Sequence, residues 1–107
     1  MLTTESAIKK VDKFTREIIQ TGIPIDRVLL FGSFAMQEQR EDSDIDVALF
    51  SKKFNGFGFE DKQLFAIINS KKEYIDIDVK TFSSIENNDS PLMEIVKKTG
   101  IELFHSV

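Results

Sequence analysis

Two short apolar segments, Arg27–Phe31 (RVLLF) and Asp44–Phe50 (DIDVALF), restrict the possible folds of this chain more than any other feature. Each has the length of a buried strand. The second alternates between acidic and apolar residues before it becomes fully apolar, which is typical of a strand that emerges from an exposed end. A third segment, Glu73–Phe82 (EYIDIDVKTF), alternates throughout and predicts a strand with one polar face. The polar face would carry Tyr74, Asp76, Asp78 and Lys80, and the apolar face Ile75, Ile77 and Val79. The sequence therefore predicts a sheet as the centre of the fold.

Helical patterns lie between and around these strands. Apolar residues recur at helical spacing over residues 4–21, and Gly22 and Pro24 then provide a stop signal. The same local signals predict a short helix at 33–38, a polar loop at 37–43, a loop at 51–59, a helix at 60–70, a last helix from Ser90-Pro91 to just before Gly100, and a short strand at 101–104. This order predicts an α/β (α+β) fold in which helices cover a sheet.

The composition excludes several classes of protein. The 107 residues fit one domain, 1–107, and the absence of cysteine excludes a disulfide scaffold, a thiolate zinc site and a cysteine nucleophile. The net charge of −4 argues against direct binding of nucleic acid, and no apolar stretch has the length of a transmembrane helix. The N-terminus, MLTTESAIKK, lacks the pattern of a signal peptide. We therefore expect a cytoplasmic protein that binds neither nucleic acid nor a membrane.

A pair of aspartates at the start of the second strand carries the clearest chemical signal. Asp44 and Asp46 are two residues apart, so on a strand both carboxylates point to one face, about 7 Å apart along the chain. Such carboxylates repel each other unless solvent or a cation lies between them. Oxygen ligands select Mg²⁺, with Mn²⁺ as a close substitute. A third carboxylate is needed to close the site, and the alternating strand offers Asp76 and Asp78.

The Gly32-Ser33 turn predicts where a phosphate would bind. Glycine lets a phosphate approach the backbone closely. Ser33 at the start of a helix would present its hydroxyl and free N–H groups to an anion. Phosphate donors and metal ligands at one place suggest phosphoryl or nucleotidyl transfer, a reaction catalysed mainly by positioning and charge neutralisation.

The spacing of these motifs resembles a known signature. Gly32-Ser33, ten residues and then Asp44-Ile45-Asp46 resemble the GS-x10-DxD pattern of the DNA polymerase β-like nucleotidyltransferase superfamily. A short chain that begins directly with one helix resembles its smallest branch, the minimal nucleotidyltransferase (MNT) proteins. The flanking segments RVLLFGSFAM and DSDIDVALF also resemble the strands of that family. The resemblance implies a nucleotidyltransferase fold with a small mixed sheet.

The resemblance also implies roles for the three acids. Asp44 and Asp46 match the aspartates that bind the metals. Asp78, rather than Asp76, matches the third carboxylate, because DVKT at 78–81 fits the family's aspartate-apolar-x-Thr/Ser run. In this superfamily the third carboxylate helps to activate the incoming hydroxyl, as a base or as a metal ligand. Whether Asp76 assists Asp78 stays open.

Gly32 and Ser33 match the positions that hold the triphosphate, but two of their neighbours depart from the pattern. Many relatives have an arginine and a glycine where this chain has Phe34 and Gln37. The loss of the arginine would weaken triphosphate binding. A catalytically weak or inactive binding module is therefore kept as an alternative to an enzyme.

The resemblance further implies a substrate and a partner. Many MNT proteins resemble antitoxins encoded beside a HEPN-domain toxin, a ribonuclease. In that group the MNT protein transfers AMP from ATP onto a tyrosine of the toxin, or blocks the toxin by binding it. We expect Mg²⁺-dependent transfer of AMP from ATP to a hydroxyl acceptor, with a HEPN-domain protein as partner, and a homo- or hetero-oligomer is compatible with this. An antibiotic-modifying transferase is a third interpretation, which usually needs an acceptor-binding domain.

Four further residues have both a functional and a structural interpretation. Arg40 is a candidate for a phosphate contact, but a surface arginine in a loop is favoured. Phe34, Phe57 and Phe59 flank the predicted site in the sequence and carry rings that can stack on a base. For these phenylalanines, packing is favoured over base binding.

Overall fold

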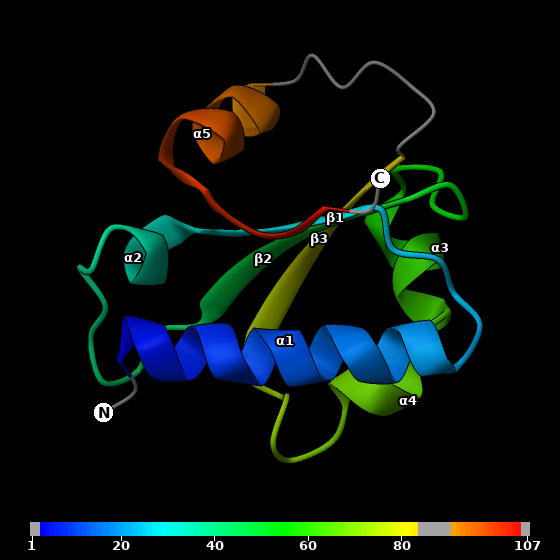
Figure 1. The fold of residues 1–107 in the computed structure, drawn as a ribbon, viewed down its shortest axis with the longest axis horizontal. Helices are drawn as coiled ribbons and strands as arrows, with labels where there is room; N and C mark the ends of the chain where they lie inside the picture. The colour runs from blue at the N-terminus through cyan, green and yellow to red at the C-terminus, as the bar shows by residue number, and fades with distance from the viewer. Residues whose placement is uncertain (1–2, 84–90, 106–107) are drawn as a thin grey trace.

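The structure, a computed structural model, describes residues 3–83 and 91–105. Within these residues the fold is a four-stranded mixed sheet with the strand order β3-β2-β1-β4 (Figure 1). The strands are β1 (Arg27–Phe31), β2 (Ile45–Ser51), β3 (Ile77–Ser83) and β4 (Ile101–His105). β1 is antiparallel to both β2 and β4, whereas β2 and β3 run parallel. The predicted mixed sheet is therefore confirmed.

Helices lie on both faces of this sheet. The helices are α1 (Thr4–Gln20), α2 (Gly32–Ala35), α3 (Gly58–Gln63), α4 (Ala66–Asn69) and α5 (Pro91–Thr99). In Figure 1, α1 and α4 lie below the sheet, whereas α5 lies above it. None of the described helices is long and apolar enough to cross a membrane.

The long helix α1 covers one face because its apolar residues share one stripe. Thr3 caps the helix, and its side chain accepts a hydrogen bond from the Ser6 amide. Thr21 ends it, and Gly22 follows with a φ of +99°. Its buried side chains are Ala7, Val11, Phe14, Thr15 and Ile18. Their spacing of three or four residues turns them all towards the sheet.

The period of two along each strand sorts the apolar residues into two cores. The larger core packs below the sheet and contains, among others, Leu30 of β1, Val47 of β2 and Val79 of β3. The smaller core lies on the other face, where α5 contributes Val96; its other members are Leu29, Phe31, Ala48, Phe50 and Phe82. The even-numbered residues of β2 and β3 therefore face α5, and this face carries the candidate site.

Three elements differ from the sequence prediction. The short helix predicted at 33–38 is α2, which begins at Gly32 and ends at Ala35. The helix predicted at 60–70 is divided into α3 and α4, because two i→i+3 turns intervene and Phe65 turns into the larger core against Phe14. The predicted strand at 73–82 begins only at Ile77, since turns occupy the four preceding residues. Tyr74, expected on the polar face, is therefore buried, and Ile75, expected on the apolar face, is exposed.

Candidate active site

The parallel register of β2 and β3 brings together two of the predicted acids. Asp46 of β2 is the direct partner of Asp78 of β3. Residues paired in this way point to the same face on strands about 4.8 Å apart. Asp78 therefore lies beside Asp46 on the face that α5 partly covers. Local sequence patterns do not reveal this pairing, because 31 residues separate the two acids.

Asp44 lies just before β2 and is exposed, while Asp46 is half-buried. Burial raises the pKa of Asp46, and the negative charges of Asp78 and then Asp44 raise it further. We call Asp44, Asp46 and Asp78 the aspartate cluster. Among the residues that the structure describes, no group of three His, Cys, Asp or Glu side chains is arranged to hold a metal ion. The cluster is thus a concentration of like charge rather than a preformed coordination shell.

A lysine for which the sequence predicts only a place on the polar face of the strand lies against this cluster. The Nζ of Lys80 is 3.6 Å from the Oδ2 of Asp78, and both side chains are partly exposed. The positive charge of Lys80 also lowers the pKa of Asp46, against the effects of burial and the two other aspartates. The spacing of Asp78 and Lys80, two residues apart on one strand, is the signal by which the sequence could have revealed this contact.

Gly32 lies directly against the aspartate cluster. Its φ of +73° is in the left-handed region that favours glycine. A Cβ atom at this position would overlap the Oδ2 of Asp46. Both the backbone conformation and the available space therefore require glycine here. The Gly32-Ser33 turn, predicted from sequence to hold phosphate, opens α2 beside the first residues of β2.

The two departures from the family pattern have different structural outcomes. Phe34 is buried in the larger core, so its side chain points away from the site, and its carbonyl oxygen accepts a hydrogen bond from Thr4. The packing interpretation of Phe34 is confirmed. Gln37 keeps a φ of +57°, a conformation that glycine adopts at little cost. The turn after α2 therefore places a non-glycine residue in the left-handed region.

Asp76, the other candidate for the third carboxylate, belongs to a different contact. Both of its carboxylate oxygens accept hydrogen bonds from the Nζ of Lys10 on α1, at 3.2 and 3.0 Å. Its backbone carbonyl accepts a hydrogen bond from the Ile45 amide. Asp76 therefore ties α1 to the start of the sheet, while Asp78 lies next to Asp46.

The remaining candidates, Arg40, Phe57 and Phe59, are exposed. Arg40 is exposed in the loop before β2, as favoured from the sequence, and its amide donates to the Ser43 hydroxyl. Phe57 and Phe59 are 69% and 82% exposed, so the packing expected for them is wrong. They also follow the far end of β2 from Asp46, so they do not flank the site.

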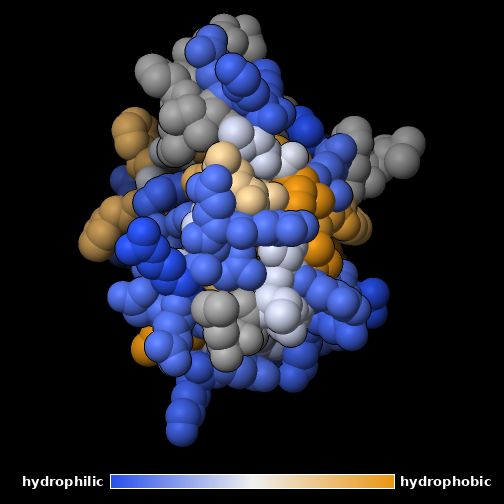
Figure 2. All heavy atoms as spheres, turned by 90° about the vertical axis from the view of Figure 1, so that its left-hand side faces the viewer, coloured by the Kyte–Doolittle hydropathy of each residue, from blue (hydrophilic) through white to orange (hydrophobic). Residues whose placement is uncertain are grey.

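The surface around α2 is largely polar. Figure 2 shows the side of the molecule that lies at the left of Figure 1, where hydrophilic side chains cover most of the surface. The loop that follows α2 contributes exposed charged residues, including Glu38, Arg40, Glu41 and Asp42. A charged ligand can therefore approach the Gly32-Ser33 turn from a hydrated surface.

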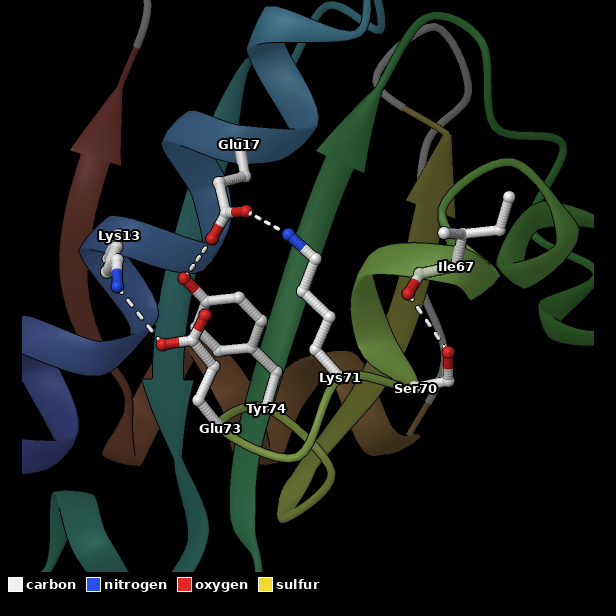
Figure 3. A network of polar contacts seen from close by, with 7 residues as sticks. All are labelled: Lys13, Glu17, Ile67, Ser70, Lys71, Glu73 and Tyr74. Atoms are coloured by element: carbon white, nitrogen blue, oxygen red, sulfur yellow. Dashed lines mark hydrogen bonds and ion pairs between the residues drawn. The ribbon is translucent and has the colours of Figure 1, made fainter.

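A second charged cluster lies on the other side of the sheet, between α1 and the turns before β3 (Figure 3). We call Lys13, Glu17, Lys71, Glu73 and Tyr74 the matched cluster. Glu17 accepts hydrogen bonds from Lys71 and from the buried Tyr74 hydroxyl, and Lys13 pairs with Glu73 at 3.0 Å. The hydrogen bond from Lys71, followed by that from Tyr74, lowers the pKa of Glu17. Burial and then the contact with Glu17 raise the pKa of Tyr74.

A mixed sheet with helices on both faces and a glycine-serine turn at the end of β1 is the architecture of the nucleotidyltransferase fold. The chain belongs to the family of polymerase beta nucleotidyltransferase domains, whose family model matches residues 13–106. A comparison with curated proteins gave no match.

Solved structures with the same fold include toxin–antitoxin complexes. A Sulfolobus solfataricus protein assigned to the nucleotidyltransferases has a TM-score of 0.66 and 16% identity, over 92% of this chain and 80% of that chain. A toxin–antitoxin structure with AMP-PNP has a TM-score of 0.60 and 25% identity, over 92% and 73%. The complex of a tri-AMPylated Shewanella oneidensis HEPN toxin with its MNT antitoxin has a TM-score of 0.58 and 21% identity, over 97% and 74%.

Proposed function

We propose that this protein is a cytoplasmic antitoxin that transfers AMP from ATP to a hydroxyl group of a HEPN-domain partner. The observation that carries the proposal is the pairing of Asp46 with Asp78, with Gly32 packed against the carboxylate of Asp46. Carboxylates, a phosphate-binding turn and a polar surface then meet at one end of the sheet. This is the set of groups that nucleotidyl transfer requires.

The acids fit a magnesium site by their chemistry. Three carboxylates at one place supply only oxygen ligands, which Mg²⁺ prefers. The raised pKa of Asp46 reflects burial and repulsion by its neighbours, and a divalent cation would relieve the repulsion. In this proposal Asp44, Asp46 and Asp78 hold the ion, with Mn²⁺ as a substitute. When bound, the ion neutralises charge on the phosphates and on the oxygen that attacks.

The other roles in the proposed reaction belong to residues of the chain. Gly32 and Ser33 hold the triphosphate through backbone N–H groups and the serine hydroxyl. Asp78 accepts the proton of the acceptor hydroxyl, whose oxygen forms a bond to the α-phosphorus of ATP. The bond between the α-phosphorus and the oxygen that bridges to the β-phosphorus breaks, and pyrophosphate leaves with that oxygen.

Two structural neighbours support the choice of nucleotide and partner. One is a toxin–antitoxin structure with AMP-PNP, and another holds a tri-AMPylated HEPN toxin with an MNT antitoxin. Both complexes pair the toxin with a chain of this fold, so we infer that a hetero-oligomer with a HEPN protein is the working form. The acceptor is then a hydroxyl side chain of that protein.

An experiment with two labelled nucleotides tests this function. The purified protein is incubated with Mg²⁺, its HEPN partner and ATP labelled either at the α- or at the γ-phosphate. We expect the partner to retain the α-label and not the γ-label, and the transfer to disappear when both Asp44→Asn and Asp46→Asn are introduced. Transfer that persists in this double variant would contradict the mechanism.

A second function is favoured by one observation, the burial of Phe34 at the position where many relatives carry an arginine. Without that cation, the protein would act as a binding module that neutralises the partner stoichiometrically. Calorimetry with ATP and Mg²⁺ distinguishes the two functions. Tight inhibition of the partner without nucleotide binding supports the module, whereas nucleotide binding and label transfer support the enzyme.

A further inference from the structure

Lys80 places a positive charge next to the aspartate cluster. It lies two residues after Asp78 on β3, so both side chains point to the same face of the sheet. Its Nζ is 3.6 Å from the Oδ2 of Asp78, and its charge also acts on Asp46. The ammonium group is therefore close to both paired carboxylates.

Three other positions bear on the supply of positive charge at this end of the sheet. Phe34 provides an apolar side chain in the core where many relatives carry a cation. Lys10 pairs with Asp76 on the α1 side of the sheet, and Arg40 is exposed in its loop. Within residues 3–83 and 91–105, Lys80 is the basic side chain whose charge acts on Asp46.

An ammonium and a divalent cation compete for the same carboxylates. Two positive charges close to Asp78 repel each other, and the repulsion grows as the distance between them falls. As they stand, the described acids are not arranged to hold a metal ion. Lys80 therefore has to leave Asp78, at least in part, before that carboxylate can act as a metal ligand.

We propose that Lys80 is the internal counter-cation of this site, which occupies the carboxylate of Asp78 in the metal-free protein and competes with the divalent cation. The inference rests on the proposed function, because it assumes that the aspartate cluster binds a metal. It adds that Lys80 lowers the affinity of the aspartate cluster for a divalent cation. It also explains how three like charges remain folded close together without a metal.

The test measures Mn²⁺ binding by the full chain, with Mn²⁺ as a paramagnetic probe whose free concentration is read by electron paramagnetic resonance. We expect Lys80→Met to bind Mn²⁺ about tenfold more tightly than the wild type, because one repulsive charge is removed. Lys80→Arg keeps the charge and should retain an affinity close to that of the wild type.

Lys10→Met is the matched control, since Lys10 makes a shorter ion pair with Asp76, two residues before Asp78 in the sequence. This variant removes a lysine–aspartate pair outside the site and should leave Mn²⁺ affinity unchanged. Thermal unfolding in EDTA provides the second readout. Lys80→Met should have a lower melting temperature than the wild type in EDTA, and saturating Mn²⁺ should remove this difference. If the methionine variant fails to fold, Lys80→Gln replaces it.

The outcomes separate this inference from the function on which it rests. If the wild type binds Mn²⁺ and Lys80→Met binds it equally or more weakly, the role of Lys80 is wrong and the metal site stands. If Lys80→Met alone binds Mn²⁺, Lys80 competes with the metal as proposed. If neither protein binds Mn²⁺, the metal-dependent function and the role of Lys80 both fail.

Discussion

The matched cluster and the aspartate cluster show two ways in which charges can be arranged in one small protein. In the matched cluster, Glu17 meets Lys71 and the Tyr74 hydroxyl, and the pKa of Glu17 falls (Figure 3). In the aspartate cluster, burial and neighbouring carboxylates raise the pKa of Asp46. The first arrangement holds α1 to the turns before β3. The second costs stability because like charges lie close together, an arrangement that is common where residues serve a function.

The largest expected effect is that of Asp46→Asn on AMP transfer. Removal of this proposed metal ligand should reduce the rate of label transfer to the partner at least about a hundredfold. The same change should raise the free energy of unfolding at neutral pH in EDTA by less than about 1 kcal/mol, since it removes repulsion at a partly exposed site. Urea denaturation measures the second effect. A variant that loses both activity and stability would remove the contrast between the two clusters.

Gly32→Ala tests how closely the glycine-serine turn packs against the aspartate cluster. We expect the free energy of unfolding to fall by about 2 to 3 kcal/mol, because alanine strains the backbone and overlaps Asp46. Gly22→Ala is the control: its φ is +99°, but nothing lies within 4 Å of the added Cβ. It should cost about 1 kcal/mol. Equal losses in urea denaturation would show that contact with Asp46 adds nothing.

Tyr74→Phe tests the stabilising role of the matched cluster. Loss of the buried hydroxyl leaves Glu17 with one partner fewer and should lower the free energy of unfolding by about 1 to 2 kcal/mol. Lys13→Met, which removes the exposed pair with Glu73, should cost less than about 0.5 kcal/mol. The measurement is urea denaturation at neutral pH, with label transfer unchanged in both variants. A loss of label transfer in Tyr74→Phe would show that the matched cluster affects the activity of the aspartate cluster.

The smallest expected effect is a difference in pH dependence between the clusters. The pKa of Glu17 lies below its ordinary value of 4.5, so its stabilisation is complete above that pH and is lost as the pH falls through the folded pKa. The pKa of Asp46 lies above its ordinary value of 3.8, so its destabilisation is complete above the folded pKa and disappears below pH 3.8.

Urea denaturation of three proteins as a function of pH measures this difference. The wild type should exceed Glu17→Gln in stability near neutral pH and converge with it in acid. Asp46→Asn in EDTA should exceed the wild type near neutral pH and also converge with it in acid. Curves that diverge as the pH falls would reverse the sign of either assignment.

Much of the fold follows from local patterns in the sequence. Alternation and apolar runs predicted β1 with its observed bounds and β2 within one residue, and the proline signal predicted the start of α5 at Pro91. The larger error, the strand predicted from residue 73, arose because Tyr74 and Asp76 continue the alternation while the chain is still in turns. Tyr74 is drawn into the core by Phe14 and Glu17, contacts that no local pattern contains.

The features of the candidate site can likewise be divided into those that the sequence determined and those that the tertiary structure decided. By itself, the sequence determined the glycine-serine turn and the paired aspartates, because their chemistry depends on residue type and on spacing within a few residues. The resemblance of the DVKT run selected Asp78 as the third acid, but only the tertiary structure decided that Asp78 pairs with Asp46 while Asp76 pairs with Lys10. The same strand register brings the charge of Lys80, the neighbour of Asp78 on β3, close to Asp46. Two aspartates on one polar stretch are chemically alike, and strand register and the packing of α1 distinguish them through contacts between residues far apart in the chain.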